Sequence, residues 1–301
     1  MTYTNNKSIS FDHGIKESGL TEKELNILIG VSQEAARRGG EILMKHYGNL
    51  NMIRTKGYEN DLLTNADLES EEEVLNYLSK STPNISILAE ESGLKGVEEA
   101  LQWCVDPLDG TTNFAHGYPF FATSIGLTFR DLPILGSISI PFLKELYVAK
   151  PGKGAYCNDK RIMVSNCNKL SNSLLVTGFA YDRQNQIDNN YAEFCSLTHK
   201  TRGVRRGGAA AVDLAFIAKG RLDGYWERGL SKWDLAAGIA IVLAAGGYVS
   251  DYKNNQFNLA SGRVIACTPG IKDELIRDLS KIKPLDGKDY GAPELSTISS
   301  L

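Results

Sequence analysis

The chain lacks the cysteine pattern of a disulfide-bonded or zinc-binding protein. Its cysteines are few, their number is odd, and none forms a C-x-x-C pair. Such usage indicates a reducing compartment and argues against a disulfide framework or a cysteine-based zinc site. The five positions are Cys104, Cys157, Cys167, Cys195 and Cys267.

A strong excess of charge is also missing. The formal net charge is −3 over 301 residues, and the one basic cluster, formed by Arg202, Arg205 and Arg206, is short. We therefore expect no nucleic-acid partner. The cluster fits either a solvated face or a patch that steers an anionic substrate.

Long hydrophobic runs are absent as well. The most apolar stretch, residues 236–247, is too short and too interrupted by glycine to span a bilayer. Residues 1–20 are polar, with no apolar segment behind a basic start, so they do not resemble a secretory signal. We expect a cytoplasmic protein without a membrane partner, and its 42% hydrophobic residues are enough for a sizeable core.

The most informative stretch is Trp103-Cys-Val-Asp-Pro-Leu-Asp-Gly-Thr-Thr-Asn-Phe114. Its first three residues predict a short buried strand, and the Asp-Pro and Asp-Gly dipeptides are turn formers that end it abruptly. Asp106 and Asp109 are therefore expected three residues apart at a strand end, where open α/β sheets place their ligands.

The residues after Asp109 favour a helix start. Gly110, Thr111, Thr112 and Asn113 can supply free backbone N–H groups, which attract phosphate. Carboxylates beside such N–H groups suit phosphoryl chemistry. The structural alternative is a pair of common turn dipeptides followed by an ordinary helix cap.

Further acidic residues extend this pattern. Residues 85–89 predict a buried strand that ends at Glu90 and Glu91, and a strand beside the central one would bring Glu90 near Asp106. We expect Glu90 to ligate a metal and Glu91 to lie in an exposed turn. Asp234 precedes an apolar helix and is either a helix cap or a ligand. All these donors are oxygens, which favours Mg²⁺ or Mn²⁺ over zinc or copper.

The fold class predicted from the pattern is α+β in the first half and α/β in the second. Residues 21–24 have the form of a capping box before a helix that ends near Gly48, and a second helix follows over residues 66–79. An antiparallel meander is expected next, and then alternating strands and helices. The meander strands are residues 122–129, 134–140, 146–149 and 154–156. The later strands are residues 174–177, 222–226 and 264–267, and the later helices are residues 189–198, 209–219, 232–245 and 272–279.

These elements predict two domains between flexible ends. We expect a flexible extension over residues 1–20, an α+β domain for metal and phosphate over 21–165, a substrate-side α/β domain over 166–283, and a flexible tail over 284–301.

The string DPLDGTTNF resembles the signature of the inositol monophosphatase family, within the Mg²⁺-dependent, lithium-sensitive sugar phosphatases. The other segments similar to this family occur in family order between about Leu25 and Leu279: Leu88-Ala-Glu-Glu-Ser92, Gly208-Ala-Ala-Ala211, Glu227 and Trp233-Asp-Leu-Ala-Ala-Gly238. The resemblance implies a layered α-β-α-β-α sandwich and a homodimer.

The resemblance also implies roles for single residues. One Mg²⁺ would be held by Glu90, Asp106 and the Leu108 carbonyl, and a second by Asp106, Asp109 and Asp234. Gly110, Thr111 and Thr112 would bind phosphate. Glu90 and Thr111 would position and deprotonate the attacking water, with Thr111 oriented by Asp67 beside Thr64. Lys56 matches a mobile-loop lysine of the family only loosely.

On the substrate side, the implied contacts are Asp109, Gly208, Ala209, Ala210 and Glu227. A surface carboxylate paired with Arg228 or Arg221 is the structural alternative for Glu227. Ala209 stands where many relatives carry serine or threonine. The implied reaction is hydrolysis of myo-inositol 1-phosphate or a similar polyol phosphate by direct attack of water.

Two alternatives remain open at this point. One is the same chemistry on fructose-1,6-bisphosphate, histidinol phosphate, galactose-1-phosphate or a 3′-phosphoadenosine nucleotide. The other is a non-catalytic binding module that retains the fold. The complete set of acidic residues argues against the second.

Overall fold

The computed structural model describes residues 11–58, 61–97, 99–184, 186–255 and 257–285. Its large sheet has eight strands in the order β10-β9-β8-β7-β6-β5-β3-β4. Among the strand pairs described in this sheet, β3 and β5 are parallel, and all the other neighbouring strands pair antiparallel. The bounds are β3 (Ser86–Ala89), β4 (Gly93–Lys95), β5 (Leu101–Asp109), β6 (Ala122–Phe129), β7 (Leu132–Ile140), β8 (Glu145–Lys150), β9 (Gly154–Cys157) and β10 (Lys160–Ile162).

A second sheet of five strands has the order β12-β11-β13-β15-β14. Its strands are β11 (Leu174–Thr177), β12 (Gly203–Arg206), β13 (Gly224–Glu227), β14 (Tyr248–Ser250) and β15 (Val264–Cys267). The strand β11 is parallel to both β12 and β13, whereas β15 runs antiparallel to β13 and β14. A separate hairpin pairs β1 (Ile53–Thr55) with β2 (Leu62–Thr64).

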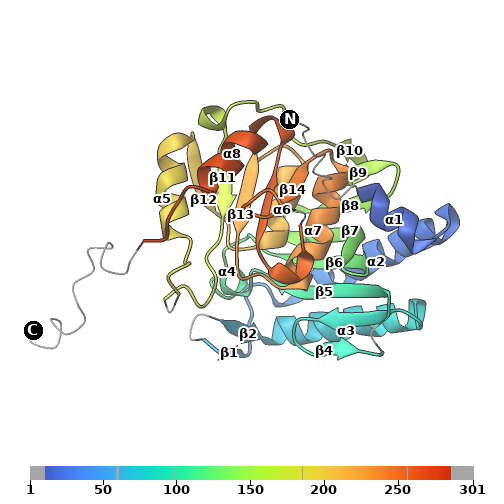
Figure 1. Cartoon of the computed structure of the whole chain (residues 1–301). Coiled ribbons are helices and arrows are strands. Elements are labelled where there is room, and N and C mark those ends of the chain that lie inside the picture. Colours follow the sequence, from blue (N-terminus) through green and yellow to red (C-terminus); the bar gives the residue numbers. More distant parts are fainter. Residues whose placement is uncertain (1–10, 59–60, 98, 185, 256, 286–301) are drawn as a thin grey trace, which may run out of the picture.

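Helices cover the sheets in layers (Figure 1). The blue and cyan helices α2 (Glu22–His46) and α3 (Asn65–Ser81) pack on one face of the large sheet. The helices α6 (Ala210–Ala218) and α7 (Lys232–Ala244) lie between the two sheets, and α5 (Tyr191–Lys200) and α8 (Lys272–Leu279) cover the outer face of the small sheet. This arrangement confirms the predicted α-β-α-β-α sandwich.

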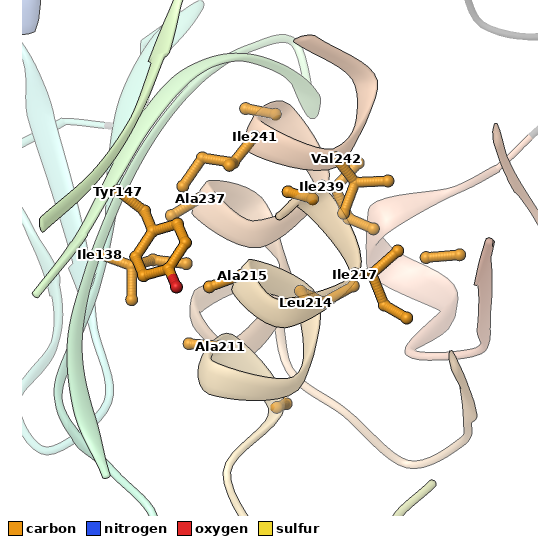
Figure 2. Packing of buried hydrophobic residues seen from close by; sticks show 14 of the residues in the cluster. Ile138, Tyr147, Ala211, Leu214, Ala215, Ile217, Ala237, Ile239, Ile241 and Val242 are labelled. Atoms are coloured by element: carbon orange, nitrogen blue, oxygen red, sulfur yellow. The ribbon is translucent and has the colours of Figure 1, made fainter. Parts of the chain in front are cut away.

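Small residues let the middle layer approach the large sheet closely. A Cβ added to Gly136 would lie 2.5 Å from Ala237 Cα, and one added to Gly126 would lie 2.6 Å from Ala236 Cβ. Figure 2 shows Ala237 and Ile241 of α7 facing Ile138 and Tyr147 of the large sheet. The apolar, small-residue sequence of α7 is therefore explained by burial on both sides, because a helix between two sheets has no solvent face.

Several expectations about local structure need correction. Residues 11–18 lie within the expected flexible extension, but they form helix α1 (Phe11–Ser18), which packs against β7. The strand at the central motif runs on to Asp109 instead of ending at residue 105, because a register shift against β6 accommodates the turn dipeptides. The strands β1, β2, β4, β10, β12 and β14 were not predicted.

The remaining short elements among the described residues are the helix α4 (Thr111–Ala115) and four 3₁₀ helices. The latter are η1 (Pro141–Leu143), η2 (Leu170–Asn172), η3 (Leu259–Ser261) and η4 (Pro269–Ile271). The domain boundary near residue 165 stays a prediction, because α6 and α7 pack against both sheets. Most of the expected tail lies outside the described residues.

Candidate active site

The acidic motif lies at the irregular end of β5. The Asp106 side chain accepts a hydrogen bond from the Leu108 N–H through Oδ1 at 3.0 Å, which stabilises the turn inside the strand. Gly110 has φ of 90°, a left-handed conformation that favours glycine, and α4 begins at the next residue. The first N–H groups of α4 have no acceptor within the helix, so they are available to an anion.

Glu90 reaches this motif from the neighbouring strand. Ala89 of β3 pairs in parallel with Val105 of β5, and the Glu90 N–H continues the ladder with a bond to the Val105 carbonyl at 3.1 Å. Parallel pairing places the two strand ends at the same edge of the sheet. Glu90 and Asp106 therefore face the same space, as expected from the two strand-then-acid patterns.

Lys56 lies among these acids. Its Nζ donates to Glu90 Oε1 at 2.7 Å and to Glu91 Oε1 at 2.6 Å. The expectation of an exposed turn at Glu91 is wrong, because its side chain is only 9% exposed and pairs with Lys56. No feature of the local sequence distinguishes Glu91 from a solvated acid, since the lysine comes from a distant segment.

Asp67 lies behind the cavity wall and connects to Thr111. Asp67 Oδ2 accepts from the N–H and the hydroxyl of Thr64, which makes the capping box of α3. Its other oxygen, Oδ1, accepts from Thr111 Oγ1 at 3.0 Å. Asp67 thus both caps a helix and orients the threonine of the motif.

The second half of the chain closes the site from the other side. Asp109 accepts from the N–H groups of Ala210 and Ala211 at 3.1 and 2.7 Å, at the start of α6. Asp234 lies in the first turn of α7 and accepts from the Ser231 N–H at 2.7 Å. Asp234 is therefore a helix-capping residue whose carboxylate also faces the cavity.

Glu227 lies at the end of β13 and is 8% exposed. Its Oε2 accepts from the Tyr225 hydroxyl at 2.6 Å. The surface-pair alternative for Glu227 is wrong, because Arg228 pairs with Asp182 and Arg221 with Glu145.

One cavity of about 500 Å³ collects these residues. Of the predicted positions, all line it except Asp67, which accepts from Thr111, and Thr64, which donates to Asp67. The lining predicted residues are Glu90, Asp106, Leu108, Asp109, Gly110, Thr111, Thr112, Gly208, Ala209, Ala210, Glu227 and Asp234. The lining residues without a predicted role include Asp61, Gly178, Phe179, Ala180, Tyr181 and Arg183.

The acids of the cavity hold their protons more tightly than ordinary carboxyls. Burial, together with neighbouring negative charges, raises the pKa of Glu90, Asp109 and Asp234 to about 7. Burial and the charges of Glu90, Asp109 and Asp234 raise the pKa of Asp106 well above its ordinary value. The Lys56 ammonium lowers the pKa of Glu90 but does not cancel the effect of burial. Like charges crowded in this way favour a bound cation.

The donors fit a hard divalent cation by their chemistry. They are carboxylates and one carbonyl, with no thiolate or imidazole among the lining residues. In the part of the chain that the structure describes, no three acidic, histidine or cysteine side chains are yet arranged as ligands around one point. Asp106, Asp109 and Asp234 instead accept from backbone N–H groups, and Glu90 accepts from Lys56.

No helix among the described residues is long and apolar enough to cross a membrane.

Of the basic cluster of the sequence, Arg206 lines the cavity, whereas Arg205, its neighbour on β12, and Arg202 do not. The alternation of a strand explains this split. This split was not predictable from the sequence, because β12 itself was not predicted.

The chain is similar in sequence and in structure to known proteins. The family model described as "Inositol monophosphatase family" matches residues 24–283. An inositol-1-monophosphatase of Synechocystis sp. is 47% identical over 258 residues, which cover 85% of this chain and 90% of that protein. A Nus factor SuhB of Pasteurella multocida is 38% identical over 262 residues, covering 86% and 97% of the two chains. The solved structure of the inositol monophosphatase from Anabaena (Nostoc) sp. matches with a TM-score of 0.80 and 46% identity, covering 87% of this chain and 98% of that one.

Proposed function

This chain belongs to the inositol monophosphatase family, and from that premise we propose that it hydrolyses myo-inositol 1-phosphate and similar polyol phosphates. The observation that carries the proposal is the convergence of Glu90, Asp106, Asp109 and Asp234 with the start of α4 in one cavity. Acidic ligands beside free N–H groups are the arrangement that phosphoryl transfer needs.

We assign the cation site to Glu90, Asp106, Asp109, Asp234 and the Leu108 carbonyl. The donor set suits Mg²⁺, with Mn²⁺ as a substitute. When bound, Mg²⁺ would neutralise charge on the phosphate and lower the pKa of a water molecule.

The protein's own residues supply the remaining steps. The N–H groups of Gly110, Thr111 and Thr112 would hold the phosphate oxygens. The Thr111 hydroxyl directs its hydrogen to Asp67 or to the Leu108 carbonyl, which leaves its lone pairs free to accept a hydrogen bond from the attacking water. Glu90, with a pKa of about 7 caused chiefly by burial, would accept the proton of that water.

The polyol would lie against the second half of the chain. We assign its contacts to Asp109, Gly208, Ala209, Ala210 and Glu227, which line one side of the cavity. Glu227 carries the selectivity, because its buried carboxyl is held in place by Tyr225 and can still accept from ring hydroxyls.

A phosphate-release screen tests the proposal. Purified protein is incubated with and without Mg²⁺ on inositol 1-phosphate, galactose-1-phosphate, histidinol phosphate, fructose-1,6-bisphosphate and a 3′-phosphoadenosine nucleotide. We expect the highest kcat/KM with inositol 1-phosphate. A higher value on another compound would move the substrate within the same chemistry, and release from none would refute the phosphatase.

The second candidate function is a Nus-factor role, favoured by the relatives that carry the name Nus factor SuhB. The greater identity to an inositol-1-monophosphatase favours the enzyme. A cell-based complementation assay with a variant that lacks catalysis separates the two, since a non-catalytic role survives the loss of turnover.

We further propose that the protein is a cytoplasmic homodimer without a nucleic-acid partner. Analytical ultracentrifugation tests the dimer, and DNA- and RNA-binding assays test the absence of a nucleic-acid partner.

A further inference from the structure

A segment that the sequence analysis assigned no role forms part of the cavity wall. Gly178, Phe179, Ala180, Tyr181 and Arg183 follow β11 and line the cavity. This segment follows a strand of the small sheet, whereas the phosphate-binding residues follow a strand of the large one. It therefore borders the part of the cavity that is left for the rest of the substrate.

The root of this segment is fixed by a buried asparagine. Asn190 Nδ2 donates to the Gly178 carbonyl and to Thr177 Oγ1, both at 2.7 Å. Asn190 Oδ1 accepts in turn from Trp226 Nε1 at 2.6 Å. The base of the segment is thus bonded to the strand that ends in Glu227.

The far part of the segment is fixed by Arg228, the residue after Glu227. Arg228 Nη2 lies 2.9 Å from Asp182 Oδ1 and Nη1 lies 3.4 Å from Oδ2, which is a two-pronged contact. The Arg228 side chain is 11% exposed, and its Nε lies 3.7 Å from Asp188 Oδ1. Asp188 also pairs with Arg263.

Tyr181 lies between these two attachments. It lines the cavity and is 45% exposed, so part of its side chain is accessible to a bound substrate. Burial of its hydroxyl, and then the negative charges of Asp61, Glu90 and Asp234, raise the pKa of Tyr181. The phenol therefore stays protonated and can donate a hydrogen bond.

We infer that Arg228 is a positioning residue that holds residues 178–183 over the cavity, and that the Tyr181 hydroxyl contacts the polyol part of the substrate. The inference rests on the proposed function, since it places a polyol phosphate in the cavity. Arg228 acts through the segment, because its guanidinium pairs with Asp182 and Arg228 itself does not line the cavity.

Steady-state kinetics with Tyr181→Phe, Arg228→Gln and the double variant test the inference on inositol 1-phosphate and on 4-nitrophenyl phosphate, which has no ring hydroxyls. We expect each single change to raise KM for inositol 1-phosphate by about 2- to 10-fold, the effect of one lost hydrogen bond, with kcat retained. KM for the aryl phosphate should change less than about 2-fold. The double variant should match the larger single effect, because both changes remove the same contact.

Matched variants separate positioning from stability. Arg228→Lys should bring KM for inositol 1-phosphate part of the way back to the wild-type value. Arg221→Gln removes the two-pronged pair with Glu145 outside the cavity and should leave KM for both substrates unchanged. Equal losses on both substrates, or additive effects in the double variant, would overturn the inference.

Hydrogen exchange gives a readout that does not depend on turnover. Arg228→Gln should accelerate exchange in the peptide that covers residues 178–183, and Arg221→Gln should not. Unchanged exchange would overturn the positioning role even in an active enzyme. A wild type that releases phosphate from no polyol phosphate would refute the proposed function instead, and the exchange result would still decide the role of Arg228.

Discussion

Lys56 Nζ lies 2.7 Å from Glu90 Oε1, so an ammonium group occupies part of the space where we place a divalent cation. Lys56 also contacts Glu91, and its side chain is 22% exposed. The pairing raises the pKa of Lys56 despite burial, which keeps it charged. The lysine therefore compensates the acids when no metal is bound and competes with the metal for Glu90.

Lys56→Gln should lower stability without metal and enlarge the stabilisation that bound metal provides. Without metal, the loss of a charged donor to two carboxylates should cost about 1–3 kcal/mol in the free energy of unfolding. With Mg²⁺, the rise in melting temperature should exceed that of wild type, because Glu90 is released to the ion. Thermal melts with and without Mg²⁺ measure both. Lys153→Gln, which alters an exposed pair with Glu22, is the control. An equal or smaller Mg²⁺-induced rise would contradict the competition.

Turnover should depend on the divalent cation. Exhaustive chelation should abolish phosphate release, Mg²⁺ should restore it, and Mn²⁺ should replace Mg²⁺ because both prefer oxygen donors. Li⁺ should inhibit, as the family resemblance implies. Phosphate release by chelated protein, followed by addition of each ion, is the measurement. Full activity after chelation would refute the metal assignment.

Glu227→Gln should change selectivity more than catalysis. The variant keeps the shape of a buried side chain but weakens a charge-assisted hydrogen bond, worth roughly 1.5–3 kcal/mol, or about 10- to 100-fold in KM for inositol 1-phosphate. KM for 4-nitrophenyl phosphate should stay near the wild-type value. Glu193→Gln, a buried acid outside the cavity, is the control. Equal losses on both substrates would show that Glu227 is structural.

Glu145 should make stability depend on pH outside the active site. Hydrogen bonds from Arg221, Lys219 and Tyr147 outweigh burial and lower the pKa of Glu145 to about 2. Because the folded pKa lies below the unfolded value near 4.5, this stabilisation is fully present above about pH 4.5 and is lost as the pH falls towards 2. Glu145→Gln should therefore destabilise the protein at pH 7 and less so at pH 3, measured by urea unfolding. A difference that is constant with pH would contradict the ion-pair origin.

The sequence predicted the part of the site that is built locally. The strand, the turn dipeptides and the glycine at residue 110 lie within one stretch, and their chemistry is readable without knowledge of the fold. Glu90 was predictable because a second strand-then-acid pattern implied a neighbouring strand. The capping sequence at Thr21 likewise marked the true start of α2.

What sequence reasoning missed depends on contacts between distant segments. Glu91 looked like a solvated acid until Lys56 was placed beside it. Tyr181 lies in a segment without periodicity, and its position is set by Arg228 and Asn190 rather than by its neighbours. The strand β12 is short, polar and at the edge of its sheet, so it carries no apolar pattern to detect.

Asp106 and Asp109 differ in their hydrogen bonds to the backbone, and this difference makes Asp106 the clearer position for testing the metal site. Both oxygens of Asp109 accept from backbone N–H groups, at Ala210 and Ala211. An asparagine there would direct its amide N–H group towards the N–H of Ala210 or Ala211. Asp109→Asn should therefore lose stability for a reason unrelated to metal. Asp106 has a single backbone donor, at Leu108.

Asp106→Asn should therefore separate loss of catalysis from loss of folding. The amide oxygen can keep the bond to the Leu108 N–H, and the amide nitrogen can donate to Glu90, which is among the charges that raise the pKa of Asp106. Removing one of several crowded carboxylates should leave stability without metal unchanged or slightly higher. Metal stabilises only the folded protein, so the variant should lose most of the Mg²⁺-induced rise in melting temperature, together with nearly all turnover. Melts and phosphate-release rates, each with and without Mg²⁺, measure both effects. A variant that melts far below wild type without metal would show Asp106 to be a structural turn residue, and one that keeps wild-type turnover would remove it from the metal site.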